Sequence, residues 1–367
     1  MVRRLLQIVL ICFIGLTSTV AAETEIERAL STIAPGTRAD LSIAIPAGAN
    51  DPATFIPITI LKGTTPGPTV LMTAGVHGYE FAPILAAARL SDRIDPALLS
   101  GNVILVRIAH IEAFEARSPY VNPNDRKNLN RDFPGDPEGS QTERIAAALS
   151  TEIIPSADFV LDVHSGDGAE WLEAFVGVYG GPLASDYATA FKFAEAMGFP
   201  NVIHYSMQTQ EQIDRGRSLN RQAVAQGLPT ILVEIGQNGS RDPKHAAAIE
   251  RGVMRGLASL GMLTKAPSPQ EIAKRYFDGA AYVSVQHSGV WTPVSAAGRF
   301  IQKGETIGTV RDYSGATVET VKAPASGYGL YGLAGPPIRA GESVITIALP
   351  TKREALAPTN GKSSPDR

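Results

Sequence analysis

Five short apolar runs that are rich in β-branched residues, with helical patterns between them, constrain the fold of this chain most strongly. Each run has the length of a buried strand and is bounded by Gly, Pro or Asp: 55–61, 69–74, 103–108, 159–163 and 230–235. The stretches between them show helical spacing or composition, at 82–90, 141–153, 185–198 and 242–261. Alternating strands and helices predict an α/β domain, with a mostly parallel or mixed sheet flanked by helices. We expect this domain to cover residues 23–263.

The composition and pattern of the sequence change after residue 263. Residues 264–280 begin with the Pro-rich stretch TKAPSPQ, which predicts a linker. From 281 to 350, short β-type runs alternate with Gly turns and predict a small antiparallel β domain. Residues 351–367 are polar and predict a flexible tail.

Residues 1–22 have the pattern of a secretory signal peptide. Arg3 and Arg4 precede an apolar run at 5–16, and small residues follow as far as Ala22. The alternative is a membrane anchor, but the run is shorter than the ~20 residues that span a bilayer. We therefore expect cleavage near Ala22 and an exported protein, periplasmic or secreted, without a stable membrane anchor after cleavage.

Charge and cysteine content exclude several classes of function. The 367 residues include 33 Lys and Arg against 36 Asp and Glu, for a formal net charge of −3. This chain has no basic excess to hold a phosphate backbone, so we expect no nucleic acid partner. The only cysteine, Cys12, lies in the predicted signal peptide. The cleaved chain would therefore have no disulfide, no cysteine nucleophile and no Cys-ligated zinc.

The segment GVHGYE carries the first candidate metal ligands. It follows the apolar run 69–74 and opens a helical pattern. His77 offers an imidazole nitrogen and Glu80 a carboxylate three residues later, a spacing that can bring both to one metal ion. Taken alone, the pair is weak evidence, because a histidine in a turn and a glutamate at a helix N-terminus are also explained by local structure.

Two further candidates end other predicted strands. His164, in DVHSG, ends the run 159–163 and is the natural third ligand, with Asp162 on the same face of the strand to orient an imidazole. Glu234 follows LPTILV, where a buried carboxylate is costly unless it is paired, coordinated or protonated. A general base beside a metal-activated water is one reason to place it there. In isolation, His164 is equally a core histidine, and Glu234 a solvent-exposed residue beyond its strand.

The positions of these residues in the predicted fold strengthen the case that each of them is functional. In open α/β sheets, ligands bind outside the carboxyl ends of the strands. His77, His164 and Glu234 lie at or just beyond the carboxyl ends of three separate predicted strands. Their coincidence predicts a zinc site with two histidines and one carboxylate, with Glu234 beside it.

A polar loop at 122–139 contains the sequence NLNRDFPG. Arg131 offers a planar guanidinium that matches a carboxylate, and Asn130 adds an amide donor. Arg126 is another cation in this loop, which either polarises a carbonyl or is simply solvated. The alternative for the whole loop is a surface segment rich in turn residues. The remaining histidines have no ligand spacing and are interpreted as structural or exposed: His110, His204, His245 and His287.

GVHGYE, NLNRDFPG, DVHSG and VEIG, in this order, resemble the succinylglutamate desuccinylase/aspartoacylase family, which is related to the zinc carboxypeptidases. The resemblance covers nearly all of the mature chain. It implies a zinc carboxypeptidase-like α/β fold followed by a small β domain, with one zinc per chain. The implied roles are zinc ligation by His77, Glu80 and His164, general base for Glu234, and a grip on the substrate carboxylate for Asn130 and Arg131.

The resemblance also implies an additional arginine that polarises the scissile carbonyl. Arg126 and Arg117 are both candidates for it, and Arg126 is our first choice. Members of the family often have Gly at the position of Arg126.

We therefore expect a zinc-dependent amidohydrolase, a deacylase or carboxypeptidase-like enzyme. The first hypothesis is removal of an acyl group from an N-acyl amino acid or a similar small amide that bears a carboxylate. The second is an exported carboxypeptidase acting on short or cell-wall peptides, because the same carboxylate grip serves both reactions. The third is a non-catalytic exported protein that binds a ligand on this scaffold.

Overall fold

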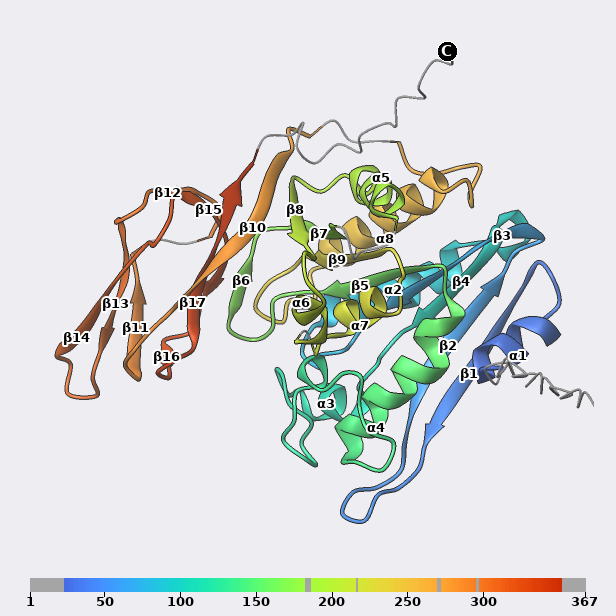
Figure 1. The fold of residues 1–367 in the computed structure, drawn as a ribbon, viewed down its shortest axis with the longest axis horizontal. Coiled ribbons are helices and arrows are strands. Elements are labelled where there is room, and N and C mark those ends of the chain that lie inside the picture. Colours follow the sequence, from blue (N-terminus) through green and yellow to red (C-terminus); the bar gives the residue numbers. More distant parts are fainter. Residues whose placement is uncertain (1–22, 182–185, 216, 269–271, 295–296, 352–367) are drawn as a thin grey trace, which may run out of the picture.

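The computed structural model describes residues 23–351 apart from 182–185, 216, 269–271 and 295–296 (Figure 1). The predicted signal peptide, Ser185 at the start of the predicted helix 185–198, and all but the first residue of the predicted tail lie outside the described residues. No helix within the described ranges combines the length and the apolar composition needed to cross a bilayer.

One mixed sheet runs through the described part of the chain (Figure 1). Its strands, in spatial order, are β1 (Thr37–Ile45), β2 (Thr54–Lys62), β4 (Ser100–Val106), β3 (Thr65–Thr73), β5 (Phe159–His164), β9 (Thr230–Glu234), β7 (Phe175–Gly180), β8 (Asn201–Ser206), β10 (Arg275–Ser284), β17 (Ser343–Pro350), β15 (Gly327–Leu333) and β12 (Phe300–Ile301), and β6 (Glu170–Leu172) pairs with β15. The stretches β4-β3-β5-β9 and β7-β8-β10 are parallel, and the other pairs are antiparallel. The five predicted strands are confirmed as β2, β3, β4, β5 and β9.

Helices cover both faces of this sheet, as the sequence predicts. On one face lie α2 (Phe81–Arg93), α5 (Tyr187–Met197) and α8 (Pro243–Ser259), and on the other α1 (Glu25–Thr32), α4 (Gln141–Ala148) and α7 (Leu219–Ala225). The strand period of two sorts the side chains between them: Val70 and Met72 pack on the first face, and Leu71 on the second. The remaining helical segments are short: α3 (Ile111–Ala116), α6 (Gln210–Asp214), and turns at Pro96–Leu98, Leu129–Arg131, Leu149–Ile153 and Ile154–Ser156.

The C-terminal region is rich in β structure, as expected. A second, antiparallel sheet contains β14 (Thr317–Lys322), β13 (Thr306–Arg311), β11 (Gly289–Pro293) and β16 (Pro337–Ile338). It packs its apolar side chains into a core that also takes in residues of β10 and β17.

The linker predicted at 264–280 is shorter than expected. Strand β10 begins at Arg275 and pairs in parallel with β8 through Phe277. Tyr276 and Phe277 are both buried in apolar clusters, and this burial favours a strand over a linker. As a result, β10 joins the C-terminal strands to the main sheet.

Candidate active site

The carboxyl ends of β3, β5 and β9 meet at one edge of the sheet because these three strands are parallel neighbours. His77 lies in the turn after β3, while His164 and Glu234 are the last residues of β5 and β9. His164 and Glu234 are directly paired in register. The sheet thus brings together residues that are far apart in the sequence.

The turn that carries His77 depends on two glycines. Gly75 has a φ of +68°, in the left-handed region that glycine adopts most readily. A Cβ on Gly78 would lie 2.0 Å from the carbonyl carbon of Ala113, so only glycine fits against α3 there. The chain then enters α2, with Glu80 as the residue before its first turn.

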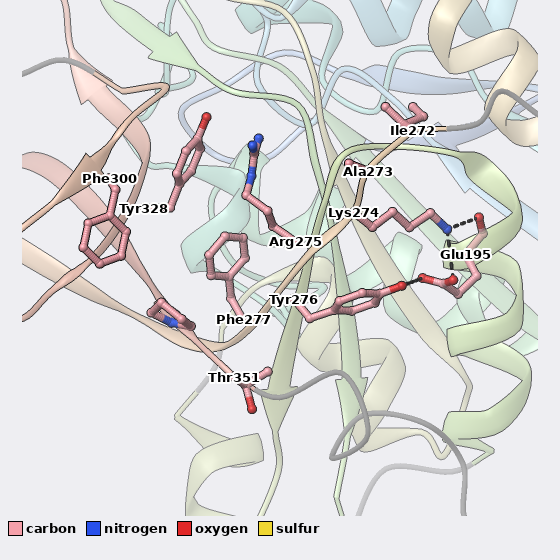
Figure 2. Close-up of a pocket in the computed structure, with 11 residues that line it drawn as sticks. Glu195, Ile272, Ala273, Lys274, Arg275, Tyr276, Phe277, Phe300, Tyr328 and Thr351 are labelled. Carbon is pink, nitrogen blue, oxygen red and sulfur yellow. Dashed lines mark hydrogen bonds and ion pairs between the residues drawn. The ribbon is translucent and has the colours of Figure 1, made fainter.

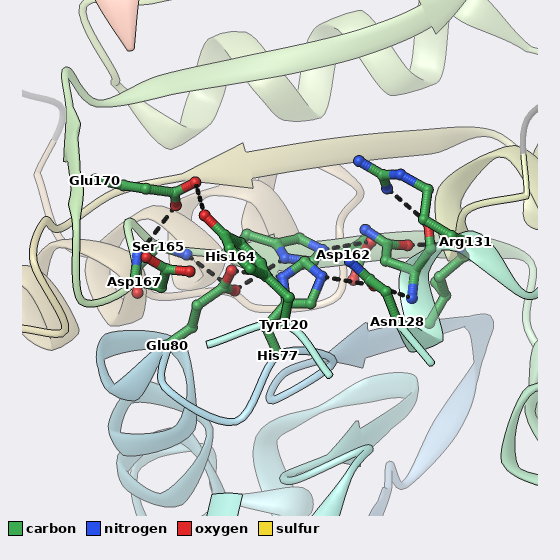
Figure 3. A network of polar contacts seen from close by, with 12 residues as sticks. His77, Glu80, Tyr120, Asn128, Arg131, Asp162, His164, Ser165, Asp167 and Glu170 are labelled. Atoms are coloured by element: carbon green, nitrogen blue, oxygen red, sulfur yellow. Dashed lines mark hydrogen bonds and ion pairs between the residues drawn. The ribbon is translucent and has the colours of Figure 1, made fainter. Parts of the chain in front are cut away.

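His77, Glu80 and His164 converge on one point (Figure 3). One Glu80 carboxylate oxygen lies 2.7 Å from Nδ1 of His77, and the other lies 2.9 Å from Nδ1 of His164. One potential ligand atom from each residue lies within 4.8 Å of the other two. These are donor types that zinc accepts.

The outer nitrogen of each imidazole has its own acceptor. Nε2 of His77 lies 3.2 Å from Oδ1 of Asn128, and Nε2 of His164 lies 2.9 Å from Oδ2 of Asp162. A proton on each Nε2 leaves the Nδ1 lone pair pointing to the centre, which is how imidazole ligands of metal sites are commonly held. The arrangement around the three residues therefore fits a metal ion.

The electrostatics of the cluster also favour a cation. Burial opposes the charge of Glu80, but the adjacent His77 and His164 outweigh it and lower the pKa of Glu80 to about 2. Burial opposes the charged form of His164 in the same way, yet Asp162 and Glu80 raise the pKa of His164 well above its usual value. The carboxylates thus hold positive charge at this point, which a proton or a metal ion can supply.

Glu234 is partly buried at the end of β9 and lines the same cavity as this cluster. Burial raises the pKa of Glu234 well above its usual value, and the negative charges of Glu80 and Glu170 add to this effect against the opposing charge of His164. A carboxyl group in such a setting is suited to proton transfer near neutral pH.

A cavity of about 690 Å³ opens over these groups. His77, Glu80, His164, Glu234, Asn130 and Arg131 all line it. The other lining residues include five tyrosines and three arginines: Tyr120, Tyr179, Tyr205, Tyr282, Tyr331, Arg215, Arg217 and Arg221. Its volume is that of a small-molecule site.

The NLNR loop reaches the cavity through a defined anchor. Asn130 is 8% exposed, and its Oδ1 accepts a hydrogen bond from the backbone N–H of Leu219 at 3.0 Å. The exposed Arg131 donates from Nη1 to the carbonyl of Asn130, and no other hydrogen bond or ion pair of its guanidinium is found among the described residues. Both residues that we expect to hold a substrate carboxylate therefore line the cavity.

Arg126 and Arg117 are placed differently from the other predicted residues. Both are exposed, both have left-handed backbone conformations, and neither lines the cavity. The structure thus gives no support to carbonyl polarisation by Arg126. Arg217 and Arg221, both near the start of α7, reach the cavity instead.

Several cavity residues were not singled out from the sequence. Glu170 accepts a hydrogen bond from the hydroxyl of Tyr120 at 2.7 Å, and Arg221 donates to the carbonyl of Gln212 at 2.6 Å. None of these residues lies in a recognisable motif. Two features could have drawn attention to them: the acidic residues of DGAE soon after His164, and the cluster of arginines at 215–221.

The other four histidines do not line this cavity. His110 is fully buried beside α3, and burial lowers its pKa to about 4. His287 is exposed and pairs with Glu319 at 3.2 Å. They fit the structural or exposed positions expected from the sequence.

A second cavity, also of about 690 Å³, lies where β10, β15 and β17 meet α5 (Figure 2). The Arg275 guanidinium stacks over the Tyr328 ring at 4.1 Å, and Lys274 pairs with Glu195 at 3.0 Å. None of the predicted ligand or catalytic residues lines it. The first cavity is therefore the candidate active site.

Comparisons with known proteins agree with this placement. Residues 66–260 match the sequence model of the succinylglutamate desuccinylase/aspartoacylase catalytic domain. N-alpha-acetyl-L-2,4-diaminobutyric acid deacetylase of Halomonas elongata is 32% identical over 273 residues, which cover 74% of this chain and 78% of the relative.

Solved structures share the fold. A succinylglutamate desuccinylase/aspartoacylase from Rhodobacter sphaeroides superposes with a TM-score of 0.75 at 24% identity, covering 87% of this chain and 98% of that one. The product-bound ectoine utilization protein EutE (DoeB) from Ruegeria pomeroyi gives a TM-score of 0.74 at 23% identity, covering 87% and 97%.

Proposed function

This chain belongs to the succinylglutamate desuccinylase/aspartoacylase family of amide-hydrolysing deacylases, and from this premise we propose that it is a zinc-dependent hydrolase. The bond it cleaves is the amide of an N-acyl amino acid or of a similar small amide that bears a carboxylate. The observation that carries the proposal is the convergence of His77, Glu80 and His164, with Glu234 beside them, in a cavity of small-molecule size.

The three ligand residues would hold one zinc ion per chain. When bound there, zinc acts as a Lewis acid that polarises a carbonyl and lowers the pKa of a water molecule to ~7. Asn128 and Asp162 keep the two imidazole rings oriented through their Nε2 atoms.

Glu234 provides the proton transfer. Its carboxylate accepts a proton from the attacking water as the oxygen bonds to the amide carbon. The same carboxyl group then donates that proton to the amide nitrogen as the carbon–nitrogen bond breaks, so that the products are an amine and a carboxylic acid. The raised pKa of Glu234 brings it closer to the value that serves both steps.

The arginines orient the substrate. Arg131 would bind the substrate carboxylate by charge-assisted hydrogen bonds, with Asn130 beside it. This contact fixes the amide relative to Glu234 and so converts binding into orientation. Arg217 and Arg221 line the cavity, whereas Arg126 does not, so these two arginines are better placed to face the carbonyl oxygen.

The relatives fit a small-molecule substrate. The Halomonas elongata relative is, by its name, a deacetylase of an acylated amino acid. We extend this class of reaction to the present chain, and we propose that it acts outside the cytoplasm after cleavage near Ala22.

The test combines metal analysis with substrate assays. Purified protein should contain about one zinc per chain and hydrolyse N-acetyl amino acids or short peptides, and His77→Ala should lose most of both zinc and activity. His287→Ala, at an exposed histidine outside the cavity, is the control. Full zinc content and activity in His77→Ala would refute the assignment. A wild-type protein that binds zinc and these compounds but hydrolyses none would be a binding protein.

A further inference from the structure

The candidate active-site cavity has two ends of opposite charge. Figure 3 shows Arg131 on one side of the histidine pair, and Glu170 and Asp167 together on the other side. Arg131 and Glu170 both line the cavity. A ligand that spans the cavity over the histidines therefore meets the Arg131 guanidinium at one end and the Glu170 carboxylate at the other, with Asp167 behind Glu170 and outside the cavity lining.

The acidic end is built from separate segments of the chain. Glu170 belongs to β6, which the C-terminal strand β15 holds in place by pairing with Leu333. The Tyr120 hydroxyl donates to one Glu170 oxygen at 2.7 Å, and the Asp167 N–H donates to the other at 3.1 Å. The position of the Glu170 carboxylate is thus fixed by the strand pairing of its backbone and by a hydrogen bond to each of its two oxygens.

Asp167 adds a second carboxylate that lacks a full set of partners. It is 1% exposed, and Figure 3 draws it between Glu170 and Glu80. Its Oδ1 accepts from the N–H of Ala169 at 3.1 Å, and the Tyr120 hydroxyl lies close enough to oppose the burial that raises its pKa, whereas Oδ2 makes no hydrogen bond of normal geometry within the described part of the chain. A buried carboxylate oxygen with an incomplete set of donors is costly, and positive charge brought by a ligand at the adjacent Glu170 would lower this cost.

The charge of this end is also uncompensated. In the described ranges no lysine or arginine forms an ion pair with Glu170 or Asp167, and hydroxyl or amide donors do not neutralise a carboxylate. Burial, and then the charge of Asp167, raise the pKa of Glu170 to about 7. A ligand with a positive charge would relieve both costs at once.

We propose that Glu170, backed by Asp167, is a subsite for an ammonium group on the acyl side of the scissile amide. The inference rests on the proposed function, in which Arg131 holds the carboxylate on the amine side and the carbonyl lies over the ligand cluster. The opposite end of the cavity then receives the acyl group. The substrates that match are aminoacyl amino acids, that is, small dipeptide-like zwitterions, and acyl groups that carry a carboxylate are disfavoured.

The test uses two substrates of nearly the same shape, glycylalanine and N-propionylalanine, which differ by an ammonium in place of a methyl group. Wild-type protein should favour glycylalanine in kcat/KM by at least ~10-fold, since a charge-assisted hydrogen bond contributes about 1.5–3 kcal/mol. Glu170→Gln should reduce this preference by ~10-fold or more, and Asp167→Asn should reduce it as a second variant. Glu173→Gln, nearby but outside the cavity, should keep it.

Binding and zinc content separate the remaining outcomes. Calorimetry on zinc-loaded Glu234→Gln should show tighter binding of glycylalanine than of N-propionylalanine, whether or not turnover is seen in the wild type. Absence of hydrolysis with this binding preference refutes the proposed function and retains the subsite. Hydrolysis with equal or inverted preference, unaffected by Glu170→Gln, refutes the subsite alone. Two zinc ions per chain, falling to one in Glu170→Gln, would also overturn it in favour of a second metal site.

Discussion

Nε2 of His164 lies 2.9 Å from Oδ2 of Asp162, and both side chains are almost completely buried. The Thr73 hydroxyl donates to the other Asp162 oxygen at 2.7 Å. Asp162 is thus held by one neighbouring strand while it holds the imidazole of its own strand. This relationship ties the geometry of the ligand cluster to the central sheet.

Replacing Asp162 should therefore weaken metal binding without removing a ligand. Asp162→Asn weakens the acceptor that fixes the His164 tautomer, and we expect zinc affinity to fall by ~10–100-fold. Competition with a chelator measures this. Asp278→Asn is the matched control, since Asp278 pairs with His204 at 3.4 Å outside the cavity. Unchanged zinc affinity in Asp162→Asn would contradict a supporting role for this carboxylate.

Glu234→Gln separates proton transfer from metal binding. The substitution keeps the shape of the side chain but removes its ability to accept a proton, so kcat should fall by at least ~10²-fold. Zinc content should stay near that of the wild type, because Glu234 is outside the ligand cluster. Metal analysis and steady-state kinetics on the same preparation test both parts. Wild-type turnover in Glu234→Gln would show that another group is the base.

Arg131→Lys tests how the substrate carboxylate is held. A lysine keeps the charge but loses the planar pair of donors, so kcat/KM for a carboxylate substrate should fall by ~10–100-fold. The penalty should largely disappear when the substrate carboxylate is replaced by a carboxamide. Arg126 is exposed and outside the cavity, so Arg126→Lys is the control. It should change kcat/KM for the carboxylate substrate and for the carboxamide substrate by no more than about twofold. A large loss in Arg126→Lys would restore its predicted role at the carbonyl.

The loop that carries Asn130 and Arg131 is anchored by an ion pair between Lys127 and Glu143 at 2.7 Å. The hydrogen bond from Lys127, and then that from the N–H of Ser140, lower the pKa of Glu143 to about 2. Because the folded pKa is below the ordinary value of 4.5, the stabilisation is complete above pH ~5 and is lost as the pH falls towards 2.

Glu143→Gln should therefore lower the free energy of unfolding at pH 7 by about 1 kcal/mol, a modest value because the pair is partly exposed. The difference between variant and wild type should shrink between pH 5 and pH 3. Urea unfolding at several pH values measures it, with the exposed Glu138→Gln in the same loop as control. A difference that stays constant down to pH 3 would rule out the ion pair as its source.

The sequence could predict that the candidate metal ligands lie close together because their positions follow from a simple rule of sheet topology. His77 lies just beyond the end of its strand, and His164 and Glu234 are the last residues of theirs. These strands are parallel neighbours, so their carboxyl ends meet at the same edge. Glu170 and Tyr120 could not be found in this way. Glu170 reaches the cavity through the short strand β6, whose partner β15 is some 160 residues away, and no local pattern encodes that pairing.

Arg126 illustrates the opposite case. It lies five residues before Arg131, in the same polar loop, so its position in the sequence favoured a role in the site. The loop instead turns at Arg126, which has a φ of 62°, and the residue is exposed. The direction of a side chain in an irregular loop depends on backbone torsions that neither periodicity nor composition reports. Arg131 of the same loop does line the cavity, together with Arg217 and Arg221 near the start of α7.

Gly78→Ala should show how closely the metal cluster depends on backbone packing. The added Cβ would meet the backbone of Ala113 and Phe114 at 2.0–2.2 Å, and backbone cannot move aside as a flexible side chain does. We expect the free energy of unfolding to fall by about 1–3 kcal/mol or more. Zinc affinity should fall with it, because His77 precedes the displaced residue. Gly252→Ala is the control. Its new Cβ would meet the end of the Met197 side chain at 3.2 Å, the Met197 carbonyl oxygen at 3.3 Å and the Phe199 ring at 3.4 Å, and none of these contacts is below 3.0 Å. We expect it to change the free energy of unfolding by no more than about 1 kcal/mol. Denaturant unfolding and chelator competition on both variants measure the two effects. Wild-type stability and zinc affinity in Gly78→Ala would show that the turn after β3 can move without disturbing the ligand geometry.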